Sequence, residues 1–368
     1  MSDGFKRIRI EGFGSIAAIE LAPGPLTVLI GANGSGKSNL LKTLRMLPLM
    51  RTGALQRFVG EAGGAAALLH YGPKQTQAIT LELDFEQGGA GNRYQVRLGF
   101  AAGDRLMYLD ESVGYRHPAS TDMAMTSLGA GHWESVLRER VQQHSRNKTV
   151  NDWLSQLSFF HFHDTSMTSA LRTQARASDD QFLRSDGSNL AAFLARLEGS
   201  DEEADRKAWR RIGLLVQRVA PDVRELLPTP AGGNSVRLDW NDDRGERFGA
   251  HQLSDGTLRA IALITALAQP IARLPRFLSI DEPELGLHPS AIGLLAELAR
   301  SVSHRTQVLF ATQSTAFLDH FDAEEVAVVE RRDGQTILER LDPECLDTWL
   351  DDYSLSEIFD KGLIGGRP

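Results

Sequence analysis

A glycine-rich motif near the N-terminus constrains this chain more than any other feature. Residues 31–38 read Gly-Ala-Asn-Gly-Ser-Gly-Lys-Ser, which matches G-x-x-x-x-G-K-S at every fixed position. The apolar run Leu26–Ile30 before the motif predicts a buried parallel strand, and Leu40–Leu47 after it predicts a helix that Pro48 ends. A loop between such a strand and helix cradles phosphate groups with its backbone N–H groups. The sequence therefore predicts an α/β fold of the P-loop NTPase type with a parallel-sheet core.

The residue types in the motif predict chemical roles. We expect Lys37 to reach the β- and γ-phosphates of ATP and the Ser38 hydroxyl to bind Mg²⁺. The other expected nucleotide-binding residues are Gly31, Asn33, Gly34, Ser35, Gly36 and Asn39. An accidental glycine-rich turn is the alternative, and the complete spacing between a strand and a helix disfavours it.

A second apolar strand ends in two acidic residues. The run Arg276–Ile280 is followed directly by Asp281, Glu282 and Pro283. An aspartate at the carboxyl end of a strand beside the P-loop strand can hold Mg²⁺ through its water shell, and Glu282 would then act as the general base that polarises the attacking water. Acidic pairs are also common turn residues, so the P-loop is what makes this assignment persuasive.

Between these two motifs lies Leu253–Arg259, a serine–glycine turn that opens an apolar helix. Its free N–H groups and the Ser254 hydroxyl could bind a γ-phosphate. A helix start that is simply capped by Ser254 or Asp255 explains the same residues equally well on local grounds.

The motifs together resemble the ABC-type ATPase heads of the RecF, SMC and Rad50 class. The resemblance lies in the order of P-loop, L-S-D-G-T, strand-D-E-P and a later strand that ends in Ala311–Ser314. The chain is more similar still to the single-head AAA-21-type ATPases of bacteria. The similarity covers nearly the whole chain and includes the strings Phe160–Ser166, Asp186–Ala191, Glu282–Pro289 and Ile364–Pro368.

This resemblance implies a Mg²⁺-dependent ATPase that forms an ATP-dependent, head-to-tail homodimer around two ATP molecules. Ser254 and Gly256 of one subunit would contact the γ-phosphate held by Lys37 of the other. Glu284–His288 would lie at the dimer seam. Gln313 would be the switch residue that senses the γ-phosphate and the attacking water.

Two residues depart from the family pattern. Most ABC heads have histidine where this chain has Gln313, which could orient water but not exchange protons near neutral pH, so turnover is expected to be slow. Asp255 replaces a glycine and brings negative charge near the partner's phosphate unless its side chain turns away. Adenine contacts are expected from the backbone of Phe13–Ser15. The usual phosphate-sensing glutamine has no clear counterpart, and His163 or Asp164 stands near that point.

The periodicity of the remaining segments predicts three parts. Residues 1–115 form an ATPase lobe with the P-loop and an antiparallel β subdomain, and residues 116–249 form a mainly helical insert that ends in a β hairpin. Residues 250–368 form an ATPase lobe with the signature motif (the L-S-D-G-T string, Leu253–Thr257), the Walker B motif (Asp281 and Glu282) and the switch residue Gln313. The segments in the first part are strands at Phe5–Ile10, Ala78–Glu86, Arg93–Phe100 and Arg105–Tyr115, and a loop with one weak helix at Gly53–Gly72. The insert is expected to contain helices from His132 to Val219 with one strand-like interruption at Leu157–His163, then a proline break at Pro221–Pro230 and a hairpin at 235–249.

Composition limits the partners. The formal net charge is −8, from 40 basic and 48 acidic residues, which argues against a general cationic coat for nucleic acid but not against a local basic patch. The single cysteine, Cys345, excludes an intramolecular disulfide and a multi-cysteine zinc site. No apolar stretch reaches the length of a signal peptide or a membrane span. We therefore expect a cytoplasmic protein without membrane contact. The resemblance to ABC-type ATPase heads implies an output to DNA or to a protein partner, as in the DNA-repair and defence systems built on such heads.

Other candidate sites have simpler explanations. His161 and His163 share one face of a strand, but no further His or Cys completes a metal site, which favours structural or nucleotide-proximal roles. A basic, tryptophan-bearing helix could meet phosphodiesters, although nearby acidic residues favour a solvated face. Its basic residues are Arg206, Lys207, Arg210, Arg211 and Arg218, and a second cluster with fewer acidic neighbours contains Arg138, Arg140, Arg146 and Lys148.

Two other functions stay open. The chain could be the ATPase subunit of a membrane transporter, although Glu284–His288 replaces the S-A-L-D-like seam usual there and the antiparallel strands fit the RecF side better. It could also be a nucleotide-gated scaffold with negligible turnover, which Gln313 would suit.

Overall fold

The computed structural model describes residues 3–365, except for the side chains of Asp347 and Thr348. The last three residues of the string Ile364–Pro368 therefore lie outside the described part. The chain divides into two compact units: the first contains the residues up to Leu157 together with those from Ala311 onward, and the second contains Ser158–Phe310. The functional division at residues 115/116 and 249/250 stays a prediction.

An antiparallel sheet dominates the first unit, with strand order β2-β1-β4-β5-β6-β7. Its strands are β1 Gly4–Phe13, β2 Ile16–Leu21, β4 Ala78–Gln87, β5 Ala90–Ala101, β6 Arg105–Arg116 and β7 Ala124–Gly129. The four strands predicted here are confirmed. Gly88 and Gly89 join β4 to β5, and both have positive φ, as the tight turns of hairpins require.

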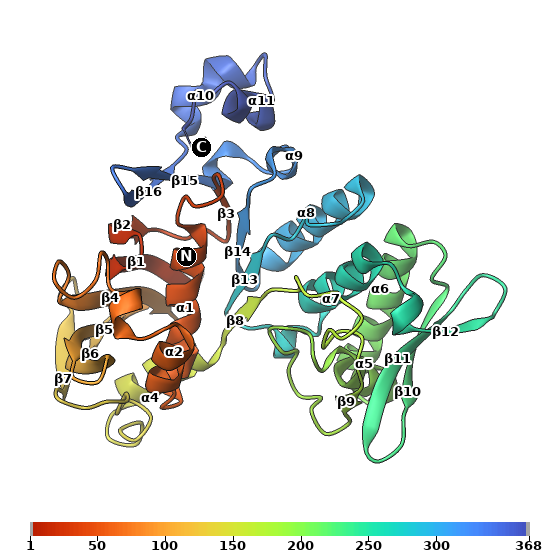
Figure 1. Cartoon of the computed structure of the whole chain (residues 1–368), viewed down its shortest axis with the longest axis horizontal. Coiled ribbons are helices and arrows are strands. Elements are labelled where there is room, and N and C mark those ends of the chain that lie inside the picture. The colour runs from red at the N-terminus through yellow and green to blue at the C-terminus, as the bar shows by residue number, and fades with distance from the viewer. Residues whose placement is uncertain (1–2, 366–368) are drawn as a thin grey trace. The chain divides into compact units, whose positions relative to one another are not determined.

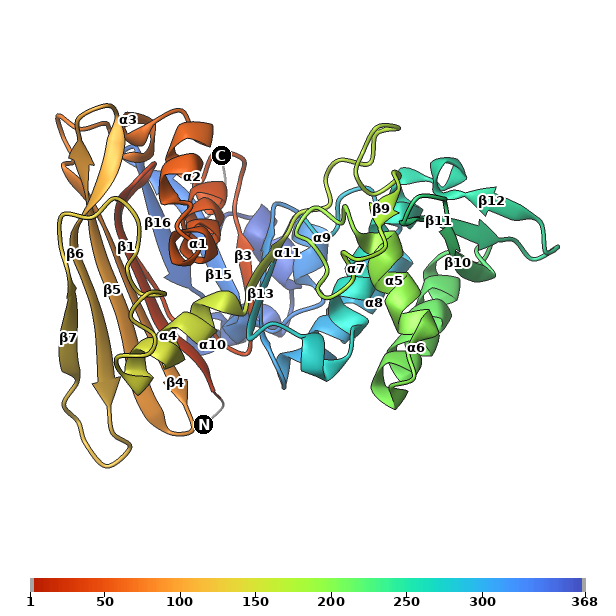
Figure 2. The same ribbon diagram turned by 90° about the horizontal axis from the view of Figure 1, so that it is seen from below.

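Helices cover one face of this sheet (Figure 2). They are α1 Lys37–Arg51, α2 Leu55–Glu61 and α4 Ser145–Ser155. Trp153 of α4 is 1% exposed and packs its ring against Phe5 and Phe85, with centroids 5.3 and 4.7 Å away. The apolar residues of the strands thus form one core with these helices.

Two predictions about this helical layer were wrong. Helix α1 continues past Pro48 to Arg51, because proline removes only one amide donor close to the helix end and Leu47 and Met50 beside it are buried. The segment Gly53–Gly72 contains two short helices, α2 and α3 Ala65–Leu68, rather than a loop with one. Burial of their apolar residues against the sheet outweighs the low helix propensity of the glycines around them.

A second strand group of the first unit carries the P-loop. Strand β3 Leu26–Ile30, buried along its whole length, pairs in parallel with β15 Val326–Arg332, which pairs antiparallel with β16 Gln335–Arg340. The predicted buried strand before the motif is therefore confirmed. The short helices α9 Thr315–Leu318, α10 Pro343–Leu350 and α11 Leu355–Asp360 complete this unit.

The second unit alternates helix and strand after His251, as predicted. Strand β13 Phe277–Asp281 lies between β14 Gln307–Thr312 and β8 Leu157–Phe160. Helix α7 Asp255–Ala268 lies between α6 Glu203–Val219 and α8 Pro289–Ser303 (Figure 1). The apolar stripe of α5 Leu190–Gly199 is buried, as its helical spacing predicted.

A small sheet of the second unit differs from the sequence-based expectation. Prolines 228 and 230 were expected to break the chain, yet they lie in strand β10 Glu225–Pro230, which pairs with β11 Ser235–Asn241; β11 also pairs with β12 Arg247–Gly249 and β9 Ala175–Arg176. Strand β10 is an edge strand, where a missing amide donor is tolerated. The strand-like interruption predicted at Leu157–His163 is confirmed by β8, but helical structure is less extensive than predicted, because residues 132–144 and 164–189 contain no helix.

Within residues 3–365, no helix combines the length and the apolarity needed to cross a membrane.

A buried ion pair fixes the start of α6. The Asp205 carboxylate, 1% exposed, accepts a hydrogen bond of 2.9 Å from Arg273. Burial pushes the pKa of Asp205 upward, but hydrogen bonds from Arg273 and Ser200 outweigh it, so the pKa lies below its ordinary value. This pair should stabilise the fold above the unfolded-state pKa, and the contribution should be lost as the pH falls through the lower folded-state pKa.

We expect Asp205→Ala to lower the free energy of unfolding by about 3 kcal/mol at pH 7, because it leaves the Arg273 charge largely buried without its partner. In urea unfolding below about pH 4, the gap to the wild type should narrow. The matched control is Glu203→Ala on the same helix, where the pair with Lys207 is exposed and its loss should go undetected. Equal effects of both substitutions would contradict this account.

Candidate nucleotide-binding and catalytic residues

The P-loop backbone lies so close to the β15–β16 hairpin that two of its positions accept only glycine. A Cβ atom at Gly31 would lie 2.0 Å from the Val329 carbonyl oxygen, and one at Gly36 would lie 1.9 Å from Thr336 Oγ1. Gly36 also has a φ of 114°, which side chains disfavour. Gly34, with a φ of 80°, faces open space instead. One side of the loop is thus pressed against the hairpin while the other is free to meet a ligand.

Lys37 places a buried positive charge inside this loop. Its side chain is 7% exposed, and Nζ donates hydrogen bonds to the carbonyl oxygens of Gly31 and Ala32 at 2.5 and 3.0 Å. Backbone N–H groups, a helix start and an ammonium group together form an anion-binding site. The arrangement fits a polyphosphate.

The residues after Lys37 link the loop to the N-terminal turn. Asn39 donates a hydrogen bond from Nδ2 to Ser15 Oγ at 2.7 Å. Its side chain also closes over Gly14, where an added Cβ would lie 2.8 Å from the Asn39 amide carbon. The turn Phe13–Ser15, predicted to contact adenine, therefore lies directly beside the P-loop helix.

Ser38 and Asp281 have the chemistry that Mg²⁺ prefers. Ser38 is exposed in the first turn of α1, and Asp281 ends β13 in the second unit. Among residues 3–365 no group of three or more His, Cys, Asp or Glu side chains could hold a metal ion. Mg²⁺ does not need such a group, because it is usually bound by one or two protein oxygens together with substrate phosphates and water.

Glu282 has an unusual backbone conformation directly after β13. Its φ is +45°, in the left-handed region that non-glycine residues rarely adopt. His163 Nε2 lies 3.1 Å from the backbone oxygen of Asp281 and so contacts the same strand end. This contact supports a structural role for His163 near the acidic pair, the alternative that the sequence favoured over a metal site.

The serine–glycine turn has the geometry of a capped helix start. Ser254 is the N-cap of α7, where its Oγ accepts a hydrogen bond of 3.1 Å from the Thr257 amide. A Cβ at Gly256 would lie 2.3 Å from the Gly286 carbonyl oxygen, so the turn packs directly against the segment Glu284–His288. The local alternative of a helix cap is thus confirmed as geometry, and it leaves a role in phosphate binding open.

Arg259 of α7 ties this turn to neighbouring segments. Its guanidinium donates to the carbonyl oxygens of Phe162 at 2.8 Å and His163 at 3.0 Å, and also to that of Leu285. Burial lowers the pKa of Arg259 below its ordinary value, although the charges of Asp255 and Glu282 oppose the shift. Two backbone segments beside the signature turn, at Phe162–His163 and at Leu285, are therefore held by one side chain of α7.

Arg172 pairs with Asp255, the acidic residue whose charge could lie near the partner's phosphate. The Asp255 carboxylate turns toward Arg172, with Nη2 and Oδ1 2.7 Å apart. The Arg172 side chain, 4% exposed, also donates to the carbonyl oxygens of Ala250 and Leu253 at 2.6 and 3.0 Å. The negative charge beside the signature is thus paired within its own unit. Sequence reasoning missed Arg172, since no motif surrounds it.

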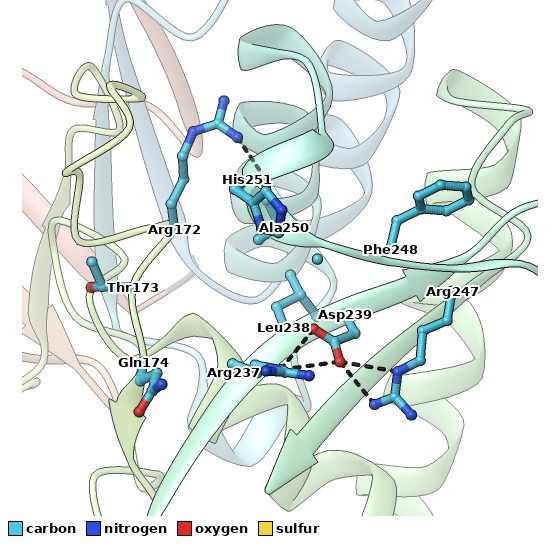
Figure 3. A pocket seen from close by; sticks show the side chains of 11 residues that line it. Arg172, Thr173, Gln174, Arg237, Leu238, Asp239, Arg247, Phe248, Ala250 and His251 are labelled. Atoms are coloured by element: carbon cyan, nitrogen blue, oxygen red, sulfur yellow. Dashed lines mark hydrogen bonds and ion pairs between the residues drawn. The ribbon is translucent and has the colours of Figure 1, made fainter. Parts of the chain in front are cut away.

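A pocket of about 730 Å³ lies next to Arg172 in the second unit (Figure 3). On its floor Asp239, 3% exposed, pairs with Arg237 at 3.1 Å and Arg247 at 2.8 Å. Its wall includes Ala250 and His251, which lead into the signature turn. The two arginines on the floor share one carboxylate, which offsets part of their charge.

The predicted site residues thus fall into two groups. The P-loop residues from Gly31 to Asn39 lie together in the first unit, which also contains Gln313 just after β14. Asp281, Glu282, Ser254 and Gly256 lie in the second unit. Sequence reasoning missed Thr336, because a single threonine in a hairpin carries no motif.

The basic helix α6 has a partly paired face. Lys207 pairs with Glu203 at 2.6 Å and Arg218 with Glu297 at 3.3 Å, which supports a solvated face for these two residues. Arg210 and Arg211 are exposed on the same helix. In the second basic cluster, Arg146 donates to Thr126 Oγ1 at 2.7 Å.

Known proteins resemble this chain in sequence. The family profile described as "AAA domain, putative AbiEii toxin, Type IV TA system" matches residues 26–319. The DNA replication and repair protein RecF of Anaeromyxobacter dehalogenans is 37% identical over 110 residues, which are 28% of this chain and 25% of RecF. The match therefore spans only a quarter of RecF. The OLD nuclease of Thermus scotoductus is 22% identical over 404 residues, covering 98% of this chain and 68% of that protein.

Solved structures show the same fold. A crystal structure of an Smc head bound to the C-terminal winged-helix domain of ScpA has a TM-score of 0.60 and 16% identity, covering 94% of this chain and 99% of that one. An Smc head with an extended coiled coil, bound to the C-terminal domain of ScpA derived from Pyrococcus furiosus, has a TM-score of 0.62 and 14% identity, covering 95% and 99%. The predicted fold, an ABC-type ATPase head, is confirmed.

The backbone at Glu282 leads to a stability test. A left-handed conformation costs roughly 1–2 kcal/mol for residues with a Cβ, so Glu282→Gly should be about 1 kcal/mol more stable than Glu282→Ala in thermal or urea unfolding. At Glu297 in helix α8 the order should reverse, because alanine is the better helix former by about 1 kcal/mol. If alanine is the more stable residue at both positions, the left-handed conformation of Glu282 is refuted.

Proposed function

This chain belongs to the AAA domain family whose profile matches residues 26–319, and on that premise we propose that it is a Mg²⁺-dependent ATPase of the ABC type. The observation that carries the proposal is the P-loop. Its buried Lys37 lies in a ring of backbone groups, and two of its glycines are required by close contact with a neighbouring hairpin. A loop with this close-packed backbone and a buried lysine is suited to bind a triphosphate.

The chain's own residues can divide the work of hydrolysis. Lys37 and the loop N–H groups would bind the β- and γ-phosphates, while Ser38 and Asp281 would hold Mg²⁺, which neutralises phosphate charge when bound. Glu282 would accept the proton of the attacking water, and Gln313 would orient that water. An amide in this place favours slow turnover, because it cannot exchange protons near neutral pH.

The proposed active state is a homodimer that closes on ATP. Ser254 and Gly256 would contact the γ-phosphate of the partner subunit, and the pairing of Asp255 with Arg172 supports this, since it offsets a charge that would repel the phosphate. ATP binding would close the dimer and hydrolysis would reopen it.

The output of this cycle would go to DNA or to a protein partner. RecF is named for DNA replication and repair, OLD is a nuclease, and the Smc heads were solved with ScpA bound. A role beside DNA would place the protein in the cytoplasm. The net charge of −8 favours a protein partner, because direct DNA contact would need a local basic patch.

Two active-site variants test the proposal. Glu282→Gln should bind ATP and sediment as a dimer with ATP and Mg²⁺, while phosphate release falls at least about 100-fold, because the general base is lost. Lys37→Ala should lose ATP binding and stay monomeric. Analytical ultracentrifugation and steady-state phosphate release measure these outcomes. A Glu282→Gln protein that stays monomeric at saturating ATP and Mg²⁺ would show that the ATP-bridged dimer is wrong.

Gln313 favours a second candidate, a nucleotide-gated scaffold with negligible turnover. Phosphate release measured with and without duplex DNA, at two salt concentrations, separates the two. A motor acting on DNA should be stimulated by DNA less strongly at the higher salt concentration, whereas a scaffold should bind ATP without appreciable release under either condition. If the exposed face of α6 is only solvated, as we prefer, charge reversal at Arg210 and Arg211 should leave any stimulation of phosphate release by DNA unchanged. Loss of that stimulation in the variant would overturn this preference.

A further inference from the structure

A ring of side-chain hydrogen bonds joins the P-loop to two distant segments of the first unit. Thr336, the second residue of β16, is 1% exposed. Its Oγ1 lies 2.6 Å from Ser15 Oγ and 3.1 Å from the Ser35 backbone oxygen. Ser15 Oγ in turn lies 2.7 Å from Asn39 Nδ2. These hydrogen bonds run from Ser35 through Thr336 and Ser15 to Asn39, and the P-loop backbone between Ser35 and Asn39 closes them into a ring.

The hydrogen bonds of this ring can be donated in only one direction. A carbonyl oxygen only accepts, so the Thr336 hydroxyl donates to Ser35 and must accept from Ser15. Ser15 Oγ then accepts from the Asn39 amide, which supplies the hydrogen at the other end. Aligned hydrogen bonds of this kind strengthen one another in a buried environment.

The hairpin that carries Thr336 is fixed at further points. The Thr336 amide donates to the Ser15 carbonyl oxygen at 2.8 Å, and Tyr71 donates from its hydroxyl to the Gly334 carbonyl oxygen at 3.2 Å. Strand β15 of the hairpin pairs with β3, which leads into the loop at Gly31. The position of the Thr336 hydroxyl over the P-loop is therefore set from several sides.

We propose that Thr336 is a positioning residue of the nucleotide site, and that its hydroxyl fixes the P-loop and the turn Phe13–Ser15 as one rigid body. The inference rests on the proposed ATP-binding function. If the two segments are fixed together, the phosphate cradle is preorganised before ligand arrives, so less conformational freedom is lost on binding. The residue acts through Ser15 and Ser35 rather than by touching the nucleotide.

Three threonine variants separate the hydroxyl from packing. Thr336→Val keeps the shape but cannot donate or accept, and Thr336→Ser keeps the hydroxyl. The matched control is Thr27→Val on β3: Thr27 is 0% exposed, and its hydroxyl accepts hydrogen bonds from Gly24 and Arg340 at 3.0 and 3.1 Å. Thr27 is the second residue of β3, near the end of the strand opposite to the P-loop.

We expect Thr336→Val to weaken binding of both ATP and tripolyphosphate about five- to tenfold, because a buried hydrogen-bond network of the loop is broken. Thr336→Ser should stay within about twofold of the wild type, and so should Thr27→Val even if its melting temperature falls as far as that of Thr336→Val. Isothermal titration calorimetry and thermal unfolding provide both readings. Unchanged affinity in Thr336→Val, or equal weakening in Thr336→Ser, would overturn the proposal.

Hydrogen exchange tests the ring without any nucleotide. In the ligand-free protein, amides of residues 34–39 should exchange faster in Thr336→Val than in the wild type, while Thr27→Val should leave them unchanged. If exchange in this loop is unaltered, the proposal fails whatever the affinities are. If the wild type binds no ATP but the exchange result is as expected, the proposed function fails and the ring stands.

Discussion

The close approach of the P-loop backbone to the β15–β16 hairpin is the constraint on which the rest of the first unit depends. The loop can lie there only because Gly31 and Gly36 have no side chains to collide with Val329 and Thr336. That contact requires β3 to be paired with β15, and it fixes where helix α1 begins. The orientation of the loop N–H groups and of Lys37 follows from this packing.

The second unit holds separate backbone segments together in a different way. Where the first unit uses glycine to bring backbones together, the second uses buried arginines to join backbone carbonyl groups of separate segments. Arg259 connects three carbonyl oxygens around the signature, and Arg172 connects two more while pairing with Asp255. Guanidinium groups suit this task because they present several donors in a fixed plane. A turn held this way keeps its shape without a large apolar core of its own.

Local signals predicted much of this fold, including the loop on which the proposed site is built. The P-loop, the strand before it and the antiparallel hairpins were correctly identified, because glycine spacing and apolar runs determine structure within a few residues. Errors arose where distant burial decides: the passage of α1 through Pro48, the helices within Gly53–Gly72, and edge strand β10. Thr336 and Arg172 had no local signal, since each acts on residues about 80 to 320 positions away.

The first unit is built from both ends of the chain, with the second unit inserted between Leu157 and Ala311. During synthesis the residues of the second unit are therefore complete before the first unit can close. The P-loop emerges early, but strand β15 and Thr336 follow almost 300 residues later. Domains generally fold as units while the chain is made, at about 5–20 residues per second. The phosphate cradle consequently stays unfinished for some tens of seconds on the ribosome, and a truncated chain that lacks the last strands cannot assemble it.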